Sequence, residues 1–592
     1  MTYTPAWAGA VVAGLVVAGI RDVVIAPGSR STPFALAALR HPALRCHSIL
    51  DERSAAFFAL GQGKVTGHPS VVLCTSGSAP AHFHPAVLEA SATACPLVLL
   101  TADRPFSMHD CGAPQTTNQQ GLFGTSVRDF VDLGDPNPSH DALRAAARRV
   151  ERAVLRSLDP VPGPVQINAR ACKPLEPPPN GSPEADAMAA LVAQLTCAVP
   201  VADHKLTARV IDLDDPVRYD LRTAERGLIV CGALGPHQAP RWETLAALAA
   251  ATGFPIVAET ASQLRRASSD PEVTLCDGFE ALLRVSTLAD RLRSDCVLQI
   301  GAAPLGSSWE SYLSGTRRHV IHPRQWADPW QSATSVHISD PDLTLRSWLA
   351  ALPPVAPSTL ARRRHHRTEL SQWNECAWKA VMNSVSDAGP LSEARAVEVA
   401  LRTLPRGTLL ALGSSLPVRE VDLYARAPGH ERVVWTQRGT NGIDGLVSGA
   451  AGAASVHGPT QLLLGDVSFL HDVGGLWIAR RATVPLVLVV LNNHGGRIFE
   501  QLPVRAATTP EELEYFTTPH DLDLAGAAQL YGVSHLRAAT ANELRHALQV
   551  AYERSRCTIV EAVVAPESAR DTLERIAREL AREVARLGEP GG

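Results

Sequence analysis

The stretch LLLGDVSFLHDVGGLWIARRATVPLVLVVLNNHGGRIFEQLP, residues 462–503, contains the pattern on which the fold prediction rests. Two short apolar runs, at 462–464 and 485–491, have the length and character of buried strands. The segment between them has a helical pattern and is long enough for one helix. A buried strand, a helix and a returning buried strand form the repeating unit of parallel α/β sheets, so we predict that unit here.

The same alternation of short apolar runs and longer Ala- and Leu-rich periodic stretches continues along the whole chain. In the first third it predicts strands at 22–26, 70–74 and 96–101, and helices at 33–40, 53–66 and 79–91. In the middle third it predicts strands within 226–234, 254–260, 296–304 and 318–323. In the last third it predicts strands within 407–415, 432–439, 461–469, 485–493 and 557–566.

The length of the chain predicts several domains. A chain of 592 residues exceeds what one hydrophobic core serves, and about three domains of roughly 200 residues are expected. Pro-rich breaks at 173–185 and 352–367 divide it accordingly. We predict an α/β protein with three doubly wound parallel-sheet domains: residues 1–180, 190–355 and 365–580. The densest basic cluster, RRRHHR at 362–367, is read as a solvated linker or a helix start.

Composition restricts the class of protein and its compartment. A net charge of −4 and a pI near 6.6 give no electrostatic case for nucleic acid or an anionic membrane. The 11 cysteines form no C-x-x-C pair, which argues against a disulfide framework or zinc site and favours a reducing cytosol. The apolar opening, 5–20, has no Lys or Arg before it, so a buried helix is predicted rather than a signal peptide. We expect a soluble cytoplasmic protein.

Polar residues follow two of the predicted strands, at the edge where parallel sheets bind ligands. Gly465-Asp466 follows the first strand, and Asn492-Asn493 follows the second. If these strands are neighbours, a carboxylate oxygen, an amide oxygen and a backbone carbonyl of NNHGG converge, and Mg²⁺ prefers such oxygen ligands. Gly495-Gly496 permits a close backbone approach. The alternative is a strand-end Asp that caps a helix and an Asn pair in a turn.

The spacing of these residues resembles the metal–diphosphate signature of thiamine-diphosphate enzymes, GDG…NN, with Val467 in place of the second glycine. Between Asp466 and Asn492 there is room for one helix and one returning strand. The resemblance implies these site residues: Asp466, Asn493 and the Gly495 carbonyl as ligands of Mg²⁺ or Mn²⁺, with Gly465 and Ser468 beside the diphosphate.

The second element of such a site is a glutamate that hydrogen-bonds the aminopyrimidine ring of the cofactor. The segment HSILDERSAAFFALGQGKV, 47–65, supplies Glu52 after a predicted strand and at the start of a predicted helix. The resemblance implies that Glu52 binds the cofactor and activates it as an electron sink for decarboxylation. The alternative is an acidic residue that stabilises the helix dipole.

Longer motifs resemble one family within this class. In the first third they are APGSRSTPFALAA (26–38), LDERSAAFFALGQGK (50–64), TSGSAPAHFHPAVLEA (75–90) and LLTADRPFSMHDCGAPQT (99–116). In the last third they are SSLPVRE (414–420), QRGTNGIDGLVSGAAG (437–452) and NNHGGRIFEQLP (492–503). They resemble MenD, the menaquinone-pathway family of 2-succinyl-5-enolpyruvyl-6-hydroxy-3-cyclohexene-1-carboxylate synthases. The resemblance implies pyrimidine-binding, central and diphosphate-binding domains in that order, and is weak over the central one.

The reaction that the resemblance implies decarboxylates 2-oxoglutarate on thiamine diphosphate and adds the succinyl carbanion equivalent to isochorismate. Both substrates are dicarboxylates, and arginine binds a carboxylate through two parallel hydrogen bonds. The match to the family motifs implies three groups of residues. The catalytic residues are Glu52, Arg30, Gln115, Arg419 and Arg438. The substrate contacts are Ser29, Arg104, Ser415, Phe499 and Leu502, and the residues against the cofactor are Ile443 and Ile498. The resemblance also implies a homodimer or homotetramer with its active site between subunits.

Two departures from the family pattern bear on the second substrate. Pro114 precedes Gln115 where the family usually has Asn, and Ser307-Ser308 stands where its central domain often has Lys-Arg. Loss of these cations weakens carboxylate binding by about 1–3 kcal/mol per charge-assisted bond unless Arg317 and Arg318 compensate. The alternatives are therefore a thiamine-diphosphate-dependent 2-oxoacid decarboxylase or carboligase with a different acceptor, and a non-catalytic protein of the same fold.

Overall fold

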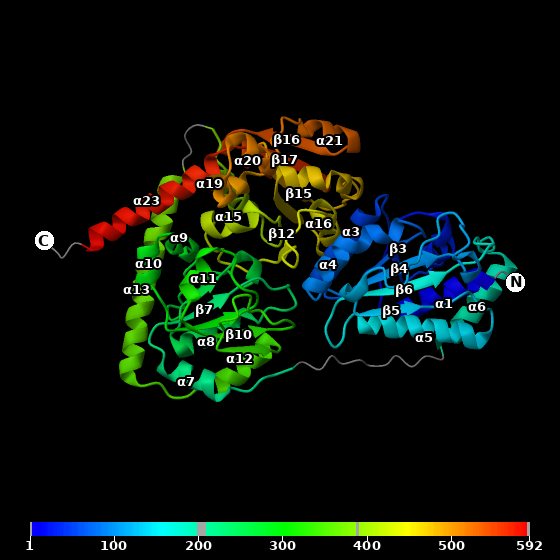
Figure 1. The fold of residues 1–592 in the computed structure, drawn as a ribbon, viewed down its shortest axis with the longest axis horizontal. Helices are drawn as coiled ribbons and strands as arrows, with labels where there is room; N and C mark the ends of the chain where they lie inside the picture. The colour runs from blue at the N-terminus through cyan, green and yellow to red at the C-terminus, as the bar shows by residue number, and fades with distance from the viewer. Residues whose placement is uncertain (1–2, 198–208, 386–389, 589–592) are drawn as a thin grey trace. The chain divides into compact units, whose positions relative to one another are not determined.

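The computed structural model describes residues 3–197, 209–385 and 390–588 (Figure 1). The chain divides into two compact units. The first unit comprises Met1–Leu206, Gln437–Gly458 and His471–Thr483. The second unit comprises Thr207–Thr436, Pro459–Leu470 and Val484–Gly592. The first unit contains one parallel sheet and the second contains two, so the predicted α/β class is confirmed.

The sheet of the first unit has six parallel strands in the order β2-β1-β3-β4-β6-β5. Its strands are β1 Asp22–Ile25, β2 Arg45–Ser48, β3 Val71–Cys74, β4 Leu97–Asp103, β5 Asp129–Asp132 and β6 Pro164–Arg170. The three predicted strands are confirmed as β1, β3 and β4, and all three are buried along their whole length. The other three strands were not predicted, because each carries charged or polar residues in place of an apolar run.

Helices cover this sheet. They are α1 Tyr3–Val17, α2 Thr32–Leu39, α3 Glu52–Thr66, α4 His84–Ala92, α5 His140–Arg156 and α6 Pro183–Cys197, with α16 Leu446–His457 and α18 Leu476–Ala479 from later in the chain. The apolar opening of the chain forms α1, a buried helix as predicted. The predicted helix at 79–91 divides into a short 3-10 turn, Ala79–Phe83, followed by α4.

Helices α3 and α16 cross with their backbones in contact. A Cβ atom at Gly61 of α3 would lie 2.0 Å from the carbonyl oxygen of Gly449. A Cβ atom at Gly452 of α16 would lie 2.0 Å from the carbonyl oxygen of Phe58. Only residues without a side chain permit this approach, so the glycines of the two motifs allow the later segment to pack on the first sheet's helix layer.

The second unit contains two further parallel sheets. The five-stranded sheet has the order β11-β10-β9-β7-β8, with β7 Gly227–Cys231, β8 Ile256–Ala258, β9 Cys296–Ile300, β10 Arg317–His322 and β11 Ser335–Ile338. The six-stranded sheet has the order β13-β12-β14-β15-β17-β16, with β12 Leu409–Leu412, β13 Val434–Thr436, β14 Thr460–Gly465, β15 Leu486–Asn492, β16 Ser534–Ala538 and β17 Cys557–Val563. Every predicted strand of the middle and last thirds is confirmed, whereas β11 and β16 were missed.

The helices of the second unit fall into two groups along the chain. Around the five-stranded sheet they are α7 Asp215–Thr223, α8 Trp242–Thr252, α9 Phe279–Leu283, α10 Ser286–Arg291, α11 Ser308–Leu313 and α12 Pro341–Ala350. After it come α13 Pro357–Ser384, α14 Glu393–Arg402, α15 Leu416–Tyr424, α17 Asp466–His471, α19 Val504–Ala507, α20 Pro510–Thr517, α21 Leu524–Tyr531, α22 Ala541–Tyr552 and α23 Ser568–Gly588. Among the described residues no helix combines the length and the apolar character needed to cross a bilayer.

The basic cluster at 362–367 lies in the N-terminal part of α13, so it is not a linker, and it is only partly solvated. Arg363 and His366 are buried. The Arg363 guanidinium donates hydrogen bonds of 2.7–2.8 Å to the carbonyls of Leu221, Ala224 and Thr252, at the ends of α7 and α8. Helix ends leave carbonyls without intrahelical partners, and a cation satisfies them well.

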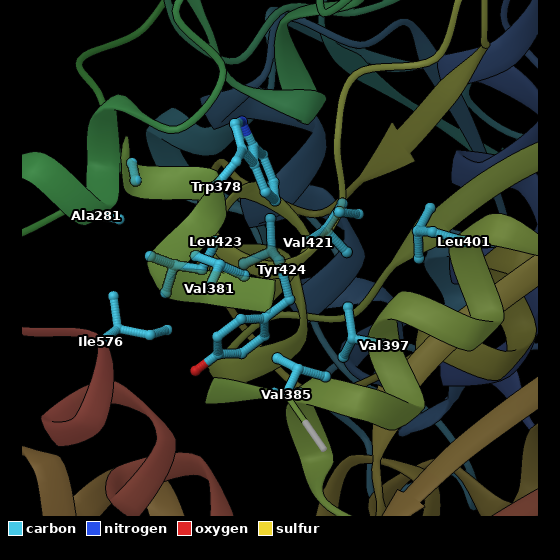
Figure 2. Packing of buried hydrophobic residues seen from close by; sticks show 14 of the residues in the cluster. Ala281, Trp378, Val381, Val385, Val397, Leu401, Val421, Leu423, Tyr424 and Ile576 are labelled. Carbon is cyan, nitrogen blue, oxygen red and sulfur yellow. The ribbon is translucent and has the colours of Figure 1, made fainter. Parts of the chain in front are cut away.

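The continuation of α13 contributes to a core that runs between the two sheets of the second unit (Figure 2). Trp378 and Val381 of α13 pack there with Leu423 of α15 and Ile576 of α23. One helix therefore binds the ends of helices beside the five-stranded sheet and fills the core beside the six-stranded one.

Candidate active site

The two predicted strand ends are neighbours. Strands β14 and β15 pair in parallel, with Gly465 opposite Leu491. Asp466 and Asn493 therefore leave the sheet at the same edge, as the sequence predicts. Asp466 opens α17 directly after its strand.

The Asp466 carboxylate is buried and held by backbone donors. Its Oδ1 accepts a hydrogen bond from the N–H of Val467 (2.7 Å), and its Oδ2 accepts one from the N–H of Gly495 (3.0 Å). The Nε2 of His520 lies 3.3 Å from Oδ2. Burial raises the pKa of Asp466, whereas the two N–H groups and His520 favour the charged form. A cation beside Asp466 would favour the charged form further.

The two asparagines have different surroundings. Asn492 is occupied: its Nδ2 donates to Glu561 Oε1 at 2.7 Å, and its Oδ1 accepts from the N–H of His494 at 3.2 Å. Asn493 donates from Nδ2 to Glu393 Oε2 at 3.0 Å, while its buried Oδ1 has no hydrogen-bond partner among the described residues. A buried amide oxygen without a donor fits a metal ligand, since leaving it unsatisfied is costly.

Gly495 completes the set in the predicted way. Its φ of +144° lies outside the range of ordinary side chains, and a Cβ atom there would lie 2.6 Å from the carbonyl oxygen of Thr517. Its carbonyl accepts a hydrogen bond from the N–H of Arg497 at 2.9 Å. A carboxylate, an unsatisfied amide oxygen and a backbone carbonyl are hard oxygen donors, so the residues present fit Mg²⁺ or Mn²⁺.

The two residues predicted beside a diphosphate lie next to this oxygen set. Gly465 ends β14, and a Cβ atom there would meet nothing within 4 Å. Ser468 is buried in α17. Gly465 therefore leaves open space at the end of the strand, beside the oxygen set.

Glu52 is the first residue of α3, as predicted. Asp51 caps this helix by accepting a hydrogen bond from the N–H of Ser54 at 2.9 Å. Because Asp51 performs the capping, the carboxylate of Glu52 is available; it is half-buried and has no hydrogen-bond partner within the described parts of the chain. Burial, and then the charge of Glu52, raise the pKa of the Cys74 thiol, which places this carboxylate near the end of β3.

Four predicted residues of the first unit follow strands of its sheet. Arg30 is buried, and its guanidinium donates to the carbonyl of Ala171 at 2.7 Å. Ser29, its neighbour, is exposed. Arg104 is half-buried directly after β4. Gln115 is exposed at a φ of +56°, and its Nε2 donates to the carbonyl of Ser76 at 3.1 Å.

A loop at 437–445 carries Arg438 and Ile443, both half-buried. Glu89 of α4 holds this loop: it accepts hydrogen bonds from the N–H of Gly439 (3.1 Å) and from the N–H (2.7 Å) and hydroxyl (3.0 Å) of Thr440. Lys64 Nζ lies 2.5 Å from Glu89. Glu89 was missed by the sequence analysis, although a lone glutamate in the apolar run of α4 was a signal of a buried partner.

The second unit contains a cavity of about 210 Å³. Three predicted site residues line it: Arg419, Ile498 and Leu502. Phe499 stacks on Phe516 instead, with ring centroids 5.7 Å apart. Ser415, which precedes α15, has a strained φ of +75° and accepts a hydrogen bond of 2.5 Å from Arg419 through its carbonyl.

Ser307 lines the same cavity, but the two arginines expected to compensate for the missing cations do not. Arg317 pairs with Asp220 at 2.6 Å. Arg318 is fully buried and is bonded to Gln299 (2.6 Å) and to Asp328. The proposed compensation by these residues is wrong, because both side chains are committed to the five-stranded sheet and its edge.

Comparison with known sequences identifies the class. The family described as "Thiamine pyrophosphate enzyme, N-terminal TPP binding domain" matches residues 7–122, and the "C-terminal TPP binding domain" of the same class matches residues 423–562. The chain thus contains segments similar to both domains of that enzyme class, and Glu52 and residues 465–495 fall inside these segments.

Full-length relatives define the family. A 2-succinyl-5-enolpyruvyl-6-hydroxy-3-cyclohexene-1-carboxylate synthase of Sorangium cellulosum is 41% identical, over 98% of this chain and 96% of the relative. Proteins of the same name from Geobacillus kaustophilus (37% identical, 89% of each chain) and Halobacterium salinarum (36% identical, 96% of this chain and 97% of the relative) also match. This chain belongs to the 2-succinyl-5-enolpyruvyl-6-hydroxy-3-cyclohexene-1-carboxylate synthase family.

Proposed function

We propose that this protein catalyses the reaction for which its relatives are named: it decarboxylates 2-oxoglutarate with thiamine diphosphate and transfers the succinyl unit to isochorismate, a step of menaquinone biosynthesis. The observation that carries the proposal is the oxygen set of Asp466, Asn493 and Gly495 at one sheet edge, within the matched C-terminal domain. The carboxylate of Glu52, at the start of α3 in the matched N-terminal domain, supports it.

In this proposal the cofactor is held by two groups of residues. Asp466, Asn493 and the Gly495 carbonyl ligate Mg²⁺ or Mn²⁺, and Gly465 and Ser468 lie at the diphosphate. Ile443 and Ile498 contact the thiamine rings. When bound, thiamine diphosphate supplies an electron sink for the electron pair released by decarboxylation.

Glu52 and the arginines have separate tasks. Glu52 exchanges a proton with the aminopyrimidine ring of the cofactor. Arg30, Arg104, Arg419 and Arg438 neutralise the carboxylates of the two substrates, helped by Ser29, Gln115 and Ser415, while Phe499 and Leu502 exclude water from the reacting carbon. Arg30 and Arg419 each donate one guanidinium hydrogen bond to a backbone carbonyl, and this bond fixes the direction of the guanidinium.

The proposal includes the organisation of the chain. The pyrimidine-binding domain is placed at 1–180, the central domain at 190–355 and the diphosphate-binding domain at 365–580. The protein is proposed to be a cytoplasmic homodimer or homotetramer. The family resemblance supports these assignments, and size-exclusion chromatography with light scattering tests the oligomeric state.

The experiment is a coupled assay of the purified protein with thiamine diphosphate, Mg²⁺ and 2-oxoglutarate, with and without isochorismate. We expect loss of isochorismate absorbance together with CO₂ release. CO₂ release with isochorismate untouched would overturn the proposal in favour of a decarboxylase or carboligase with a different acceptor, the reading that Ser307-Ser308 motivates.

A further inference from the structure

The cavity of the second unit has two unlike walls. One wall comes from motif segments of the proposed active site: Arg419 at the start of α15, and Ile498 and Leu502 of the segment after β15. The other wall comes from the five-stranded sheet region and includes Glu280, Arg284, Ser307 and Trp309. None of the second group belongs to a motif from which a role was inferred, and Ser307 marks the position where cations were expected.

Most acidic groups at the cavity already accept hydrogen bonds from protein donors. Asp422 accepts hydrogen bonds from the N–H and hydroxyl of Thr260 (2.7 and 2.6 Å) and lies 3.2 Å from the Arg265 guanidinium. Asp277 accepts from the indole N–H of Trp378 at 2.6 Å. Glu259 accepts from the N–H of Leu305 at 2.5 Å. Asp422 and Asp277 are thus committed to other protein donors, whereas Glu259 also attracts Arg419 electrostatically.

Arg284 and Arg419 retain hydrogen-bonding capacity. Arg419 donates one hydrogen bond, to the carbonyl of Ser415 (2.5 Å), and burial lowers its pKa against the opposing effect of Glu259 and Glu280. The guanidinium of Arg284 lies 3.6 Å from Glu280 Oε1, which is an ion pair without a hydrogen bond. A guanidinium has five N–H donors, so both arginines have donors left for a ligand.

Glu280 has a second partner besides Arg284. The indole N–H of Trp309 donates to Glu280 Oε2 at 3.1 Å. Burial raises the pKa of Glu280 to about 7, with the charge of Arg284 acting in the opposite direction. At neutral pH Glu280 is therefore a weaker competitor for Arg284 than a fully ionised carboxylate is.

We propose that Arg284, together with Arg419, forms a carboxylate-binding subsite for one of the two dicarboxylate substrates. Arg284 thereby takes the part of the cations that Ser307-Ser308 lacks. The inference rests on the proposed function for the identity of the substrates, 2-oxoglutarate or isochorismate. The side chain of Arg284 lines the cavity and is 31% exposed, so an anion in solution can reach it.

The test compares Arg284→Gln and Arg284→Lys with the control Arg291→Gln, whose guanidinium pairs with Glu369 at 3.0 Å outside the cavity. KM is measured for each substrate in turn, with the other saturating. Loss of a charge-assisted, bidentate contact predicts that Arg284→Gln raises one KM by about 10- to 100-fold. Arg284→Lys should recover part of that loss, and the control should match the wild type. The substrate whose KM rises identifies the occupant.

A second readout keeps this test separate from the test of the proposed function. Each substrate is added to the wild type and the variants, and the rise in melting temperature is recorded. We expect Arg284→Gln to lose the rise for one substrate. If the wild type fails to consume isochorismate, the function is wrong, and the melting data still test the subsite. Unchanged KM values and unchanged melting shifts in Arg284→Gln would overturn the subsite.

Discussion

Asn493 and its neighbour Asn492 have the same side chain, but their buried hydrogen bonds give them different roles. Glu393 accepts the hydrogen bond from Asn493 Nδ2, which turns the amide oxygen toward the strand-end site. Glu393 is itself buried, and burial raises its pKa to about 7. Asn492 points its amide at Glu561 and so supports the sheet. The pair is therefore one candidate ligand and one structural residue.

Removal of the Asn493 amide should weaken cofactor binding. In Asn493→Ala the metal loses a ligand, and we expect the affinity for thiamine diphosphate with Mg²⁺ to fall at least about 10-fold, a loss typical even of residues behind a ligand. Titration of the cofactor against melting temperature measures this. The exposed Asn542→Ala is the control; equal affinities in the two variants would refute the ligand assignment.

Replacement of Glu52 should separate chemistry from folding. Among the residues that the structure describes the carboxylate has no hydrogen-bond partner to lose, so Glu52→Gln should melt at the wild-type temperature. It should lower kcat by at least about 100-fold, the range for loss of a proton-transfer group. Steady-state assay with saturating cofactor measures kcat, with exposed Glu514→Gln as the matched change. A fully active Glu52→Gln enzyme would exclude the cofactor role.

At the scale of elements, Glu89 holds the loop that carries Arg438 and Ile443. The loop donates two backbone N–H groups to one carboxylate, and Lys64 offsets its charge. Buried carboxylates of this kind are costly unless paired, and their loss leaves several groups unsatisfied. The position of Arg438 thus depends on a residue of α4.

Loss of the Glu89 charge should loosen the loop before it unfolds the protein. In Glu89→Gln we expect faster amide hydrogen exchange at 437–445 and a several-fold higher KM for at least one substrate, because Arg438 is no longer held in place. Exchange mass spectrometry and steady-state kinetics measure the two effects. Glu151→Gln removes another mostly buried, ion-paired glutamate of the same unit and should leave this loop unchanged. Equal loop exchange in the two variants would contradict the anchoring role.

Strands with a clear apolar run, such as β3 and β15, were predicted from the sequence, and so was β10 despite its arginines and histidines. Strand β6 was not predicted, because Gln166, Asn168 and Arg170 lie buried within it and form hydrogen bonds to residues of neighbouring strands and loops. Polar residues of this kind can be assigned to a buried strand only when their hydrogen-bond partners are known. The motif residues of the site were predictable because they follow strands, and the end of a strand is marked by the point where an apolar run stops. Arg284 lies in no motif, and only the fold brings it to Arg419.

On the scale of the whole molecule, α13 connects the parts of the second unit through buried basic side chains and buried apolar side chains. Its N-terminal half carries Arg363 and His366, and its C-terminal half carries Trp378 and Val381 into the core. Burial, with the nearby charge of Arg226, lowers the pKa of His366 to about 3. His366 is therefore neutral in the folded protein and becomes charged more readily in the unfolded chain.

This difference predicts a loss of stability in mild acid. A base whose pKa is lowered on folding destabilises the fold as pH falls below its unfolded pKa of about 6.5. Between pH 7.5 and 5.5 His366 should reduce the free energy of unfolding by about 1 kcal/mol. Asp472, with a pKa raised to about 6, acts in the opposite direction over the same range. The wild-type profile alone is therefore not diagnostic.

The diagnostic comparison is His366→Leu against the exposed His365→Leu. Chemical denaturation at both pH values gives the free energy of unfolding for each variant. We expect that of His366→Leu to fall by about 1 kcal/mol less than that of the wild type, whereas His365→Leu should follow the wild type. Parallel profiles for all three proteins would show that His366 does not carry the acid sensitivity.

During translation, α3 is synthesised long before α16. Until residues 446–457 have been translated, the glycine face of α3 around Gly61 lacks the helix that packs on it. A nascent chain that stops short of residue 437 also lacks the loop that Glu89 holds. The first unit, although most of its residues precede those of the second, therefore needs residues that are translated much later. Truncation of the last third should leave the N-terminal sheet with an uncovered surface of the kind that molecular chaperones bind.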